Sequence, residues 1–573
     1  MLDLVIHGGE VVDGTGSARR RADVGVAGDR IVALGTVEGE AARRIDATGR
    51  VVTPGFIDVH THFDAQLFWD GDLTPSPLHG VTTALAGNCG FSIAPLSADP
   101  ADGDYLMRML ARVEGMPLES LREGVPWNWR STAAYLDAAE GRLGINAGFM
   151  AGHSAIRRTV MGQAAPERAA TEDELEAMRS LLRAACEAGA LGFSSSWART
   201  HNDADGHMVP SRYATREELV ALAGVAGEFP GTSLEFIPMV GPAFEPWAVE
   251  LMADLSAAAA RPLNWNLLAV SASSRVPAAA KLAAGDVARK RGGKVVALTV
   301  PMSVATRLSF ASGFVLDAMP GWEEIMTAPL DTKRAALADA GTRAALAEAA
   351  RRPDNPLAVL ANWSAMVIYD VVAPDNEAYR GRRVGEIAGE EGRDPFDVLC
   401  DIAVADELRT SFGIPPRPET HDDWVARAEV WRDRRALIGA SDAGAHLDLL
   451  ATFNYATVVL DQAVRAHAVM GLEEAVALMT DAPAQLYGLR DRGRVTEGAY
   501  ADLVVLDPAT VASQDVAMRF DLPGGAGRLY AEAVGIDHVV VNGTAVVSHG
   551  RLTGSRTGRV LRSGRDTVTP SLD

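Results

Sequence analysis

The central part of the chain, residues 53–494, alternates short apolar runs with longer segments whose apolar residues recur at helical spacing. This alternation is typical of repeated βα units, in which a helix follows and covers each strand. Together with the opening run 55–62, the strand candidates number eight, and the others are 147–150, 191–194, 233–237, 263–267, 295–300, 357–360 and 436–439. The pattern predicts an α/β fold with a (β/α)8 TIM-like barrel, whose reactive groups lie at the carboxyl ends of the strands.

The connections between these strands carry two helix-start signals. Thr171 with Glu174 and Thr215 with Glu218 have capping-box spacing, and the first of these helices runs toward a plausible stop at Gly189. One connection is too long for an ordinary loop. The stretch 305–355 is therefore expected to be an insertion, which is either a lid over the catalytic face or a surface embellishment.

The two ends of the chain share a different pattern, because short β-rich runs there are separated by turn residues at regular intervals. Near the C-terminus, Asn542 and Gly543 stand between two such runs and mark a hairpin. We therefore expect residues 1–52 and 495–573 to fold together into a small β-sandwich around the inserted barrel domain, 53–494.

Composition narrows the choice of partners and compartment. The 573 residues carry a formal net charge of −21, which argues against a nucleic-acid or anionic membrane surface and supports a soluble protein. The expected partner is a small-molecule substrate. No apolar run approaches the roughly 20 residues of a membrane span, and the start does not resemble a signal peptide. Three cysteines cannot form a disulfide framework and suit a reducing cytoplasm. A homo-oligomer is left open.

The opening strand ends in His60-Thr61-His62. Side chains alternate faces along a strand, so the two imidazoles point to the same side and form half of a metal site. Histidine is the commonest metal ligand, although an isolated pair can also stand on a strand by chance.

Two further residues strengthen the metal interpretation. Cys89 follows the apolar strand 80–86 between Asn88 and Gly90, where a thiolate could bind a cation, although a buried inert thiol is the alternative. Asp442 follows the last candidate strand among small residues, so it is a candidate general base facing the metal, with a turn-capping role as the alternative.

Three motifs together resemble the amidohydrolase superfamily, and most closely its D-aminoacylase (N-acyl-D-amino-acid deacylase) branch. They are residues 54–62, which end in His-Thr-His, residues 80–90, which end in Gly-Asn-Cys-Gly, and residues 492–504, which end in Ala-Asp-Leu-Val. Further matches at 152–157, 192–195, 213–219 and 441–442 extend the resemblance over nearly the whole chain.

The resemblance implies a TIM-like barrel with a split β-sandwich and one or two divalent transition metal ions, usually zinc, that activate water. It carries His60, His62, Cys89 and Asp442 over as metal-site residues, with Asp442 as the proton shuttle.

The chain departs from the family pattern on two middle strands, where the family has metal-binding histidines. The corresponding runs here are Leu234-Glu235-Phe236 and Asn264-Trp265-Asn266. In one interpretation Glu235 replaces a histidine as an oxygen ligand, while Asn266 is a weak one. In the other, the usual metal position is empty or rebuilt and the activity is altered or absent. A carboxylated bridging lysine is not expected, since none of the four lysines follows a strand in the required position.

Other residues near strand ends receive candidate roles. His153 could stabilise the oxyanion, and the Arg157 guanidinium could hold a substrate carboxylate. Arg199, His201 and Tyr213 could line the substrate entrance, and Asn266 completes the substrate-binding set with Arg157, Arg199 and Tyr213. Hydrogen bonding to loop backbone or a solvated surface position is the alternative for these residues.

The leading functional hypothesis is a metal-dependent hydrolase that cleaves the amide C–N bond of an N-acyl amino acid, possibly D-configured, or of a related small amide. Metal-activated water would attack the acyl carbon, with Asp442 as the proton donor to the leaving nitrogen. One alternative is a cyclic amide or imide hydrolase on the same scaffold. Another is a catalytically silent homologue that binds a metabolite.

Overall fold

The computed structural model describes residues 1–355 and 357–572, and its centre is a series of parallel strands. Strand neighbours follow chain order in a four-stranded sheet and a six-stranded sheet, with the interrupted third strand, β10 and β11, bridging the two. The strands are β8 (Phe56–Asp58), β9 (Val81–Ala86), β10 (Asn146–Phe149), β11 (Ala151–Gly152), β12 (Gly192–Ser196), β13 (Ser233–Ile237), β14 (Pro262–Ala269), β15 (Lys294–Val300) and β18 (Ala436–Ile438). The mixed α/β class is confirmed.

The segments that follow the first and the last of these strands lie side by side. The Asp442 amide donates to the His60 carbonyl at 3.0 Å, and the His62 amide donates to the Ala443 carbonyl at 2.7 Å. One buried apolar cluster draws on residues in or beside successive strands: Ile57, Leu85, Met150, Leu191, Val296, Leu298 and Leu437.

The second strand of the series differs from the sequence-based list. The expected strand at 357–360 is wrong, because Leu357 lies in a turn and the next residues belong to a short 3-10 helix, Ala358–Ala361, whose Leu360 packs against the core of the insertion. The strand that completes the series is β9, which precedes Cys89. A short apolar run has no clear period, so its sequence alone does not separate strand from helix.

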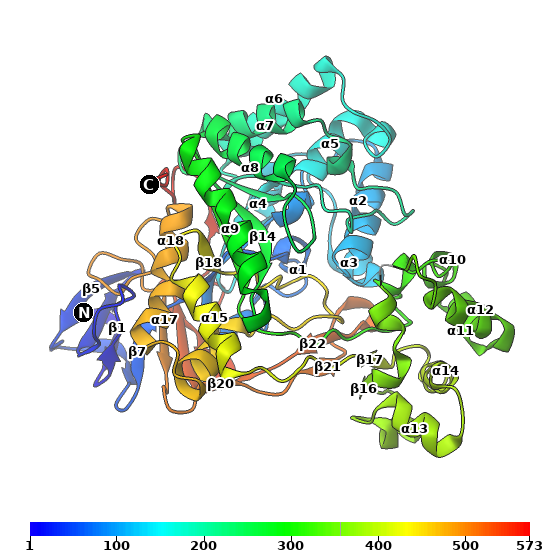
Figure 1. Ribbon diagram of the computed structural model, residues 1–573. Helices are drawn as coiled ribbons and strands as arrows, with labels where there is room; N and C mark the ends of the chain where they lie inside the picture. Colours follow the sequence, from blue (N-terminus) through cyan, green and yellow to red (C-terminus); the bar gives the residue numbers. More distant parts are fainter. Residues whose placement is uncertain (356, 573) are drawn as a thin grey trace.

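Helices follow the strands, and consecutive members α6 to α9 pack against one another along the outside (Figure 1). The capping box predicted at Thr171 is formed, and Gly189 ends the same helix in a left-handed conformation with φ 106°. At Thr215 the hydroxyl accepts from the Glu218 amide as expected. The helices are α2 (Pro100–Val113), α3 (Leu118–Gly124), α4 (Thr132–Ala139), α5 (His153–Met161), α6 (Glu172–Ala188), α7 (Arg216–Gly227), α8 (Pro246–Ala259), α9 (Arg275–Lys290), α15 (His421–Trp431), α17 (Leu472–Met479) and α18 (Asp481–Tyr487).

The chain ends meet in a mixed sheet, in which most but not all strand pairs are antiparallel, at the side of the molecule that carries the N-terminus (Figure 1). In a seven-stranded sheet, β7 (Val51–Pro54) pairs with β19 (Leu503–Leu506), which pairs with β24 (Ile536–Val541). The predicted hairpin joins β24 to β25 (Thr544–Ser548), with positive φ at both Asn542 and Gly543. A four-stranded sheet holds β1 (Leu2–His7), β4 (Asp23–Ala27), β5 (Arg30–Gly35) and β6 (Ala41–Asp46), whereas the late strand β27 (Val560–Leu561) pairs with β10.

The insertion after β15 has a core of its own and projects on the opposite side of the molecule from the N-terminal strands (Figure 1). It reaches beyond the expected 305–355, because buried residues from Leu308 to Phe412 share that core. Its elements are α10 (Glu323–Met326), α11 (Leu330–Ala338), α12 (Ala340–Ala350), β16 (Val367–Asp370), α13 (Val384–Glu391), α14 (Pro395–Ala405) and β17 (Ser411–Gly413). Among the described residues, no helix combines the length and apolar content needed to cross a membrane.

Candidate metal centre and active site

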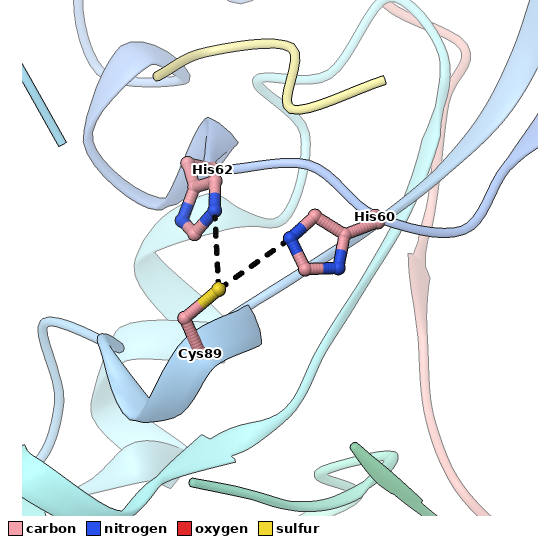
Figure 2. Close-up of side chains that lie close together, drawn as sticks. All are labelled: His60, His62 and Cys89. Atoms are coloured by element: carbon pink, nitrogen blue, oxygen red, sulfur yellow. Dashed lines mark hydrogen bonds between the residues drawn. The ribbon is translucent and has the colours of Figure 1, made fainter. Parts of the chain in front are cut away.

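His60 and His62 lie just beyond β8, at the carboxyl end of the strand series, and each is only 1% exposed. Their rings meet edge to face with centroids 5.4 Å apart. The Nε2 atoms of both rings point toward the sulfur of Cys89 (Figure 2), at 3.5 Å from His60 and 3.8 Å from His62. The two histidines therefore share one face, as their spacing predicted, and a third donor joins them.

Cys89 reaches the histidines from a tight turn that follows β9. Its φ of 58° lies in the left-handed region, which is uncommon for a residue with a side chain and often marks a functional position. The turn is tied down on both sides, because Asn88 Nδ2 donates to the Thr61 carbonyl at 3.1 Å and the Cys89 amide donates to Glu235 Oε2 at 2.7 Å. These contacts direct the thiol toward the histidine pair.

Asp442 completes the centre from the loop after β18, again with a left-handed φ of 56°. Its Oδ1 lies 3.2 Å from Nε2 of His60 and 3.2 Å from Nε2 of His62. The side chain is 33% exposed, whereas both histidines are buried. Asp442 therefore stands between the buried nitrogen donors and the open side of the site, where a substrate would enter.

The spacing of these donors fits a divalent metal ion. Four ligands about 2.0–2.3 Å from one tetrahedral cation lie about 3.3–3.8 Å from one another. Here Nε2 of each histidine lies 3.2 Å from Asp442 Oδ1, and the two nitrogens lie 3.5 and 3.8 Å from Cys89 Sγ. In the described part of the chain, the donors of His60, His62 and Cys89 all lie within 4.8 Å of one another. Two imidazoles, one sulfur and one carboxylate are a donor set that suits a transition metal.

Burial and mutual charge strongly perturb the acid–base properties of these groups. Burial raises the pKa of the Cys89 thiol well above its ordinary value. Burial disfavours the charged form of His62, but the carboxylates of Glu114 and Asp442 raise its pKa to about 9. Desolvation likewise opposes ionisation of Asp442, yet the two histidines hold its pKa well below the usual range. A bound cation would replace the shared protons and favour the thiolate.

The two middle strands contribute polar residues rather than histidines. Burial raises the pKa of Glu235 to about 8, and its Oε1 has no hydrogen-bond partner among the described residues. Asn266 Nδ2 lies 3.3 Å from His60 Nε2 and 3.8 Å from Cys89 Sγ. Asn264 instead bonds the Leu234 carbonyl and the Tyr487 hydroxyl. Glu235 and Asn266 therefore belong to the centre, whereas Asn264 supports the strands.

His153 and Arg157 lie in a separate buried network on α5. His153 Nδ1 bonds Ser195 Oγ and its Nε2 bonds Glu218 Oε1, both at 2.8 Å. Arg157 pairs with the same glutamate and donates to the Arg168 carbonyl at 2.8 Å. Both nitrogens of His153 are thus engaged within the protein. For His153 and Arg157, this geometry favours hydrogen bonding that organises the loop over direct contact with a substrate.

The loop after β12 brings one of its candidate residues to the centre. His201 lines a cavity of about 160 Å³ together with Cys89 and Asp442, and its Nδ1 bonds Ser196 Oγ at 2.7 Å. Arg199 is exposed, and Tyr213 is partly buried in the short 3-10 helix Pro210–Tyr213. Neither of these two is among the residues that line this cavity.

A larger cavity of about 580 Å³ opens beside the centre, and His60, Asn266 and Asp442 contribute to its wall. The rest of the wall is mainly apolar and comes from β14, the end of β15 and the loop after β18. It includes Leu267, Ala269, Val270, Val300, Met302, Val304 and Leu450. A polar reaction centre at the edge of an apolar cavity is the usual form of a small-molecule site.

Two residues at the centre were not assigned a role from the sequence. Glu114 follows α2, where its Oε2 lies 3.5 Å from His62 Nε2. His446 lies four residues after Asp442 and lines the 160 Å³ cavity with Glu114. The proximity of His446 to Asp442 in the sequence could have indicated it, but Glu114 follows an amphipathic helix rather than a strand and carries no such signal.

Known proteins resemble the chain over nearly its whole length. The model of the amidohydrolase family matches residues 43–547. A D-aminoacylase of Alcaligenes xylosoxydans xylosoxydans is 31% identical, covering 98% of this chain and 97% of that protein. An N-acyl-D-glutamate deacylase of the same organism is also 31% identical and covers 98% and 96%.

A solved structure agrees with these matches. The N-acyl-D-glutamate deacylase from Bordetella bronchiseptica, complexed with zinc and a phosphonate mimic of the tetrahedral intermediate, is 27% identical to this chain. The alignment has a TM-score of 0.64 and covers 98% of this chain and 100% of that chain. The family and the relatives identify a hydrolase of carbon–nitrogen bonds other than peptide bonds. The resemblance seen in the sequence motifs is confirmed, and the chain belongs to the amidohydrolase family, within its D-aminoacylase branch.

Proposed function

We propose that the enzyme removes the acyl group from an N-acylated D-amino acid at a zinc site held by His60, His62, Cys89 and Asp442. The observation that carries this proposal is that Nε2 of His60 and of His62 each lies 3.2 Å from Asp442 Oδ1 and 3.5–3.8 Å from Cys89 Sγ, beside an apolar cavity. Zinc, when bound, lowers the pKa of water and polarises a carbonyl group. The relatives that act on N-acyl-D-amino acids support the substrate class.

Asp442 moves the proton in this proposal. Its carboxylate accepts a proton from the attacking water as the new C–O bond forms at the acyl carbon. It then donates this proton to the amide nitrogen as the C–N bond breaks, and the products are a carboxylate and a free amine. The partial exposure of the Asp442 side chain supports this role, because a proton carrier must reach both the water and the leaving group.

Asn266 and the apolar cavity orient the substrate. Asn266 lines both cavities, and its side-chain amide offers a donor for the acyl oxygen, where negative charge develops in the tetrahedral intermediate. The cavity of about 580 Å³ supports an apolar acyl group or amino-acid side chain. We assign His153 and Arg157 to positioning, since Glu218 already occupies both side chains.

The closure of the barrel and the limits of the domains are part of the same proposal. We infer one closed (β/α)8 barrel, since the end of β8 is hydrogen-bonded to the loop after β18 and one apolar cluster fills the interior. The terminal sheets then form the small β-sandwich, with domain limits at 1–52, 53–494 and 495–573, except that β27 pairs with β10 of the barrel domain. A cytoplasmic location and a homo-oligomer stay predictions, as do direct substrate contacts by Arg199 and Tyr213.

Metal analysis together with a substrate screen tests the proposal. The purified enzyme should contain zinc and hydrolyse N-acyl-D-amino acids faster than their L-enantiomers or cyclic imides. His207→Asn, a change at an exposed histidine, is the matched control for His60→Asn. A metal-free protein that gains no activity with added zinc would refute the proposal. Faster hydrolysis of cyclic imides would replace it with the cyclic alternative.

A further inference from the structure

We propose that Arg427 of α15 binds a carboxylate group of the substrate and thereby makes the enzyme selective for anionic N-acyl amino acids. The inference deepens the proposed function and rests on it for the identity of the substrate. The cavity of about 580 Å³ is lined by His60 and Asp442 at the candidate metal centre and also by Arg427. One space therefore connects the reacting groups with this guanidinium.

Arg427 is buried in the second turn of α15 and is only 3% exposed. Its Nε donates to the Val270 carbonyl at 3.1 Å, just beyond the end of β14. Its Nη2 donates to Ser303 Oγ at 3.3 Å, in the loop after β15, and forms an ion pair with Glu419. These contacts hold the guanidinium at the wall of the cavity through Nε and Nη2.

The third nitrogen, Nη1, has no hydrogen-bond partner among the described residues, although it is buried. A guanidinium carries five N–H donors, and a buried donor without an acceptor is costly. Trp424, one turn earlier on α15, shares this property, because its Nε1 is also buried without a partner. The Arg427 guanidinium carbon lies 4.6 Å from the centre of the Trp424 ring. Two neighbouring donors thus lack the acceptor that an anionic ligand provides.

Arg427 is also the cation that a substrate can reach. Among the described residues that line this cavity and the one of about 160 Å³, it is the only arginine or lysine. Arg157 is already paired with Glu218, and the exposed Arg199 lines neither cavity. The net charge of −21 repels an anionic substrate, so its carboxylate requires a local cation. A planar guanidinium suits a carboxylate because it offers parallel N–H donors.

The ion pair with Glu419 allows a purely structural role of Arg427 to be tested separately. Glu419 also accepts from the Ser303 amide at 2.8 Å, so it anchors the loop after β15 as well as the arginine. A substitution of Glu419 therefore breaks the ion pair but leaves the cation in the wall, whereas a substitution of Arg427 removes both.

Equilibrium binding to the metal-free full-length enzyme tests the proposal without any need for catalysis. The probes are N-acetyl-D-leucine, its neutral carboxamide N-acetyl-D-leucinamide, and N-acetyl-D-isoglutamine, which has a side-chain carboxylate but a neutral α-carboxamide. By isothermal titration calorimetry, the wild type should bind at least one of the two acids about 10-fold or more tightly than N-acetyl-D-leucinamide. The acid that binds more tightly distinguishes the α-carboxylate from a side-chain carboxylate.

Arg427→Met should weaken binding of the preferred acid by about 10- to 100-fold and change carboxamide binding by less than about 3-fold. Arg427→Lys keeps the charge but loses the forked geometry, so it should show a smaller loss of the same preference. Glu419→Gln should retain the preference. Arg289→Met changes an exposed arginine on α9 and should bind all three probes like the wild type.

Thermal unfolding identifies any variant that has lost its fold, and Arg427→Lys provides the test if Arg427→Met does not fold. In the zinc-loaded enzyme, the substitution of Arg427 should raise KM for the preferred acid more than it lowers kcat. This split is expected because the carboxylate is bound equally before and during the reaction.

The outcomes separate this inference from the proposed function. It is overturned if the wild type binds neither acid more tightly than the carboxamide, or if a folded Arg427 variant keeps the full preference. Equal losses in Glu419→Gln and Arg427→Met would overturn it in favour of a structural ion pair. An acid preference that depends on Arg427, in an enzyme that hydrolyses no N-acyl-D-amino acid, would support the carboxylate site and refute the proposed function. Hydrolysis without that preference would do the reverse.

Discussion

Two buried histidine clusters lie near each other at the carboxyl ends of the strands, and they differ in how their polar atoms are satisfied. Around His60 and His62, the nitrogen atoms face a thiol and a carboxylate at 3.2–3.8 Å, with spacing suited to a cation. Around His153, both ring nitrogens lie 2.8 Å from an oxygen of Ser195 or Glu218. The first cluster has donors spaced for a cation, whereas both ring nitrogens of His153 are engaged within the protein.

This contrast shows that a histidine near a strand end is not by itself a metal or substrate ligand. What distinguishes the two clusters is whether the protein already provides a donor or an acceptor for each ring nitrogen. Close to the first cluster, the side chain of Glu114 is buried and its Oε2 lies 3.5 Å from His62 Nε2. The following changes test the contrast, beginning with the largest expected effect.

His60→Asn should empty the metal centre and lower kcat/KM by at least about 10³-fold, because it removes a nitrogen donor from the set that holds the ion. Zinc content by elemental analysis and kcat/KM measure the effect, with His207→Asn as the control. Normal zinc content in the variant would show that His60 is not a ligand.

Asp442→Asn should lower kcat by about 10²- to 10⁴-fold, since an amide cannot accept and return the proton of the attacking water. Zinc bound through His60, His62 and Cys89 should be partly retained, so activity falls further than metal content. Measurement of both quantities on one preparation checks this. An equal fall in the two would reduce Asp442 to a metal ligand alone.

His153→Asn should act on stability rather than on the metal. The change leaves the buried carboxylate of Glu218 with Arg157 as its remaining partner and should cost about 2–4 kcal/mol of unfolding free energy. Urea unfolding, zinc content and kcat at low temperature separate these effects. A large loss of kcat at unchanged stability would restore His153 as the oxyanion donor.

His79 extends the contrast to a histidine with neutral partners, Thr457 Oγ1 at 2.8 Å and the Ala531 carbonyl at 3.1 Å. Burial lowers the pKa of His79 to about 4, below its ordinary value of 6.5. The unfolded chain therefore binds more protons between these values, and stability falls as the pH falls. The contribution of His79 should decrease by about 1 kcal/mol from pH 6.5 to 5.5.

His79→Gln should remove this part of the pH dependence, because the amide keeps a donor and an acceptor but does not titrate in that range. Unfolding free energies of the wild type and the variant at the two pH values provide the measurement. Parallel profiles would contradict the assignment of a neutral buried His79.

The sequence alone determined the features that depend on short-range geometry. Alternation along a strand placed His60 and His62 on one face, and capping chemistry at Thr171 set the start of α6. Cys89 and Asp442 could also be predicted, since each follows an apolar strand and the carboxyl ends of parallel strands meet at one side of the fold.

Only the tertiary structure determines which residues pack around these strand-end positions. The run 357–360 became part of the insertion because its apolar residues pack there, which no local period could reveal. Glu114 reaches the centre from the end of a helix, and His153 is engaged by a glutamate 65 residues away. Local periodicity determines which way a side chain points, but its partners come from distant segments and depend on how the whole chain packs.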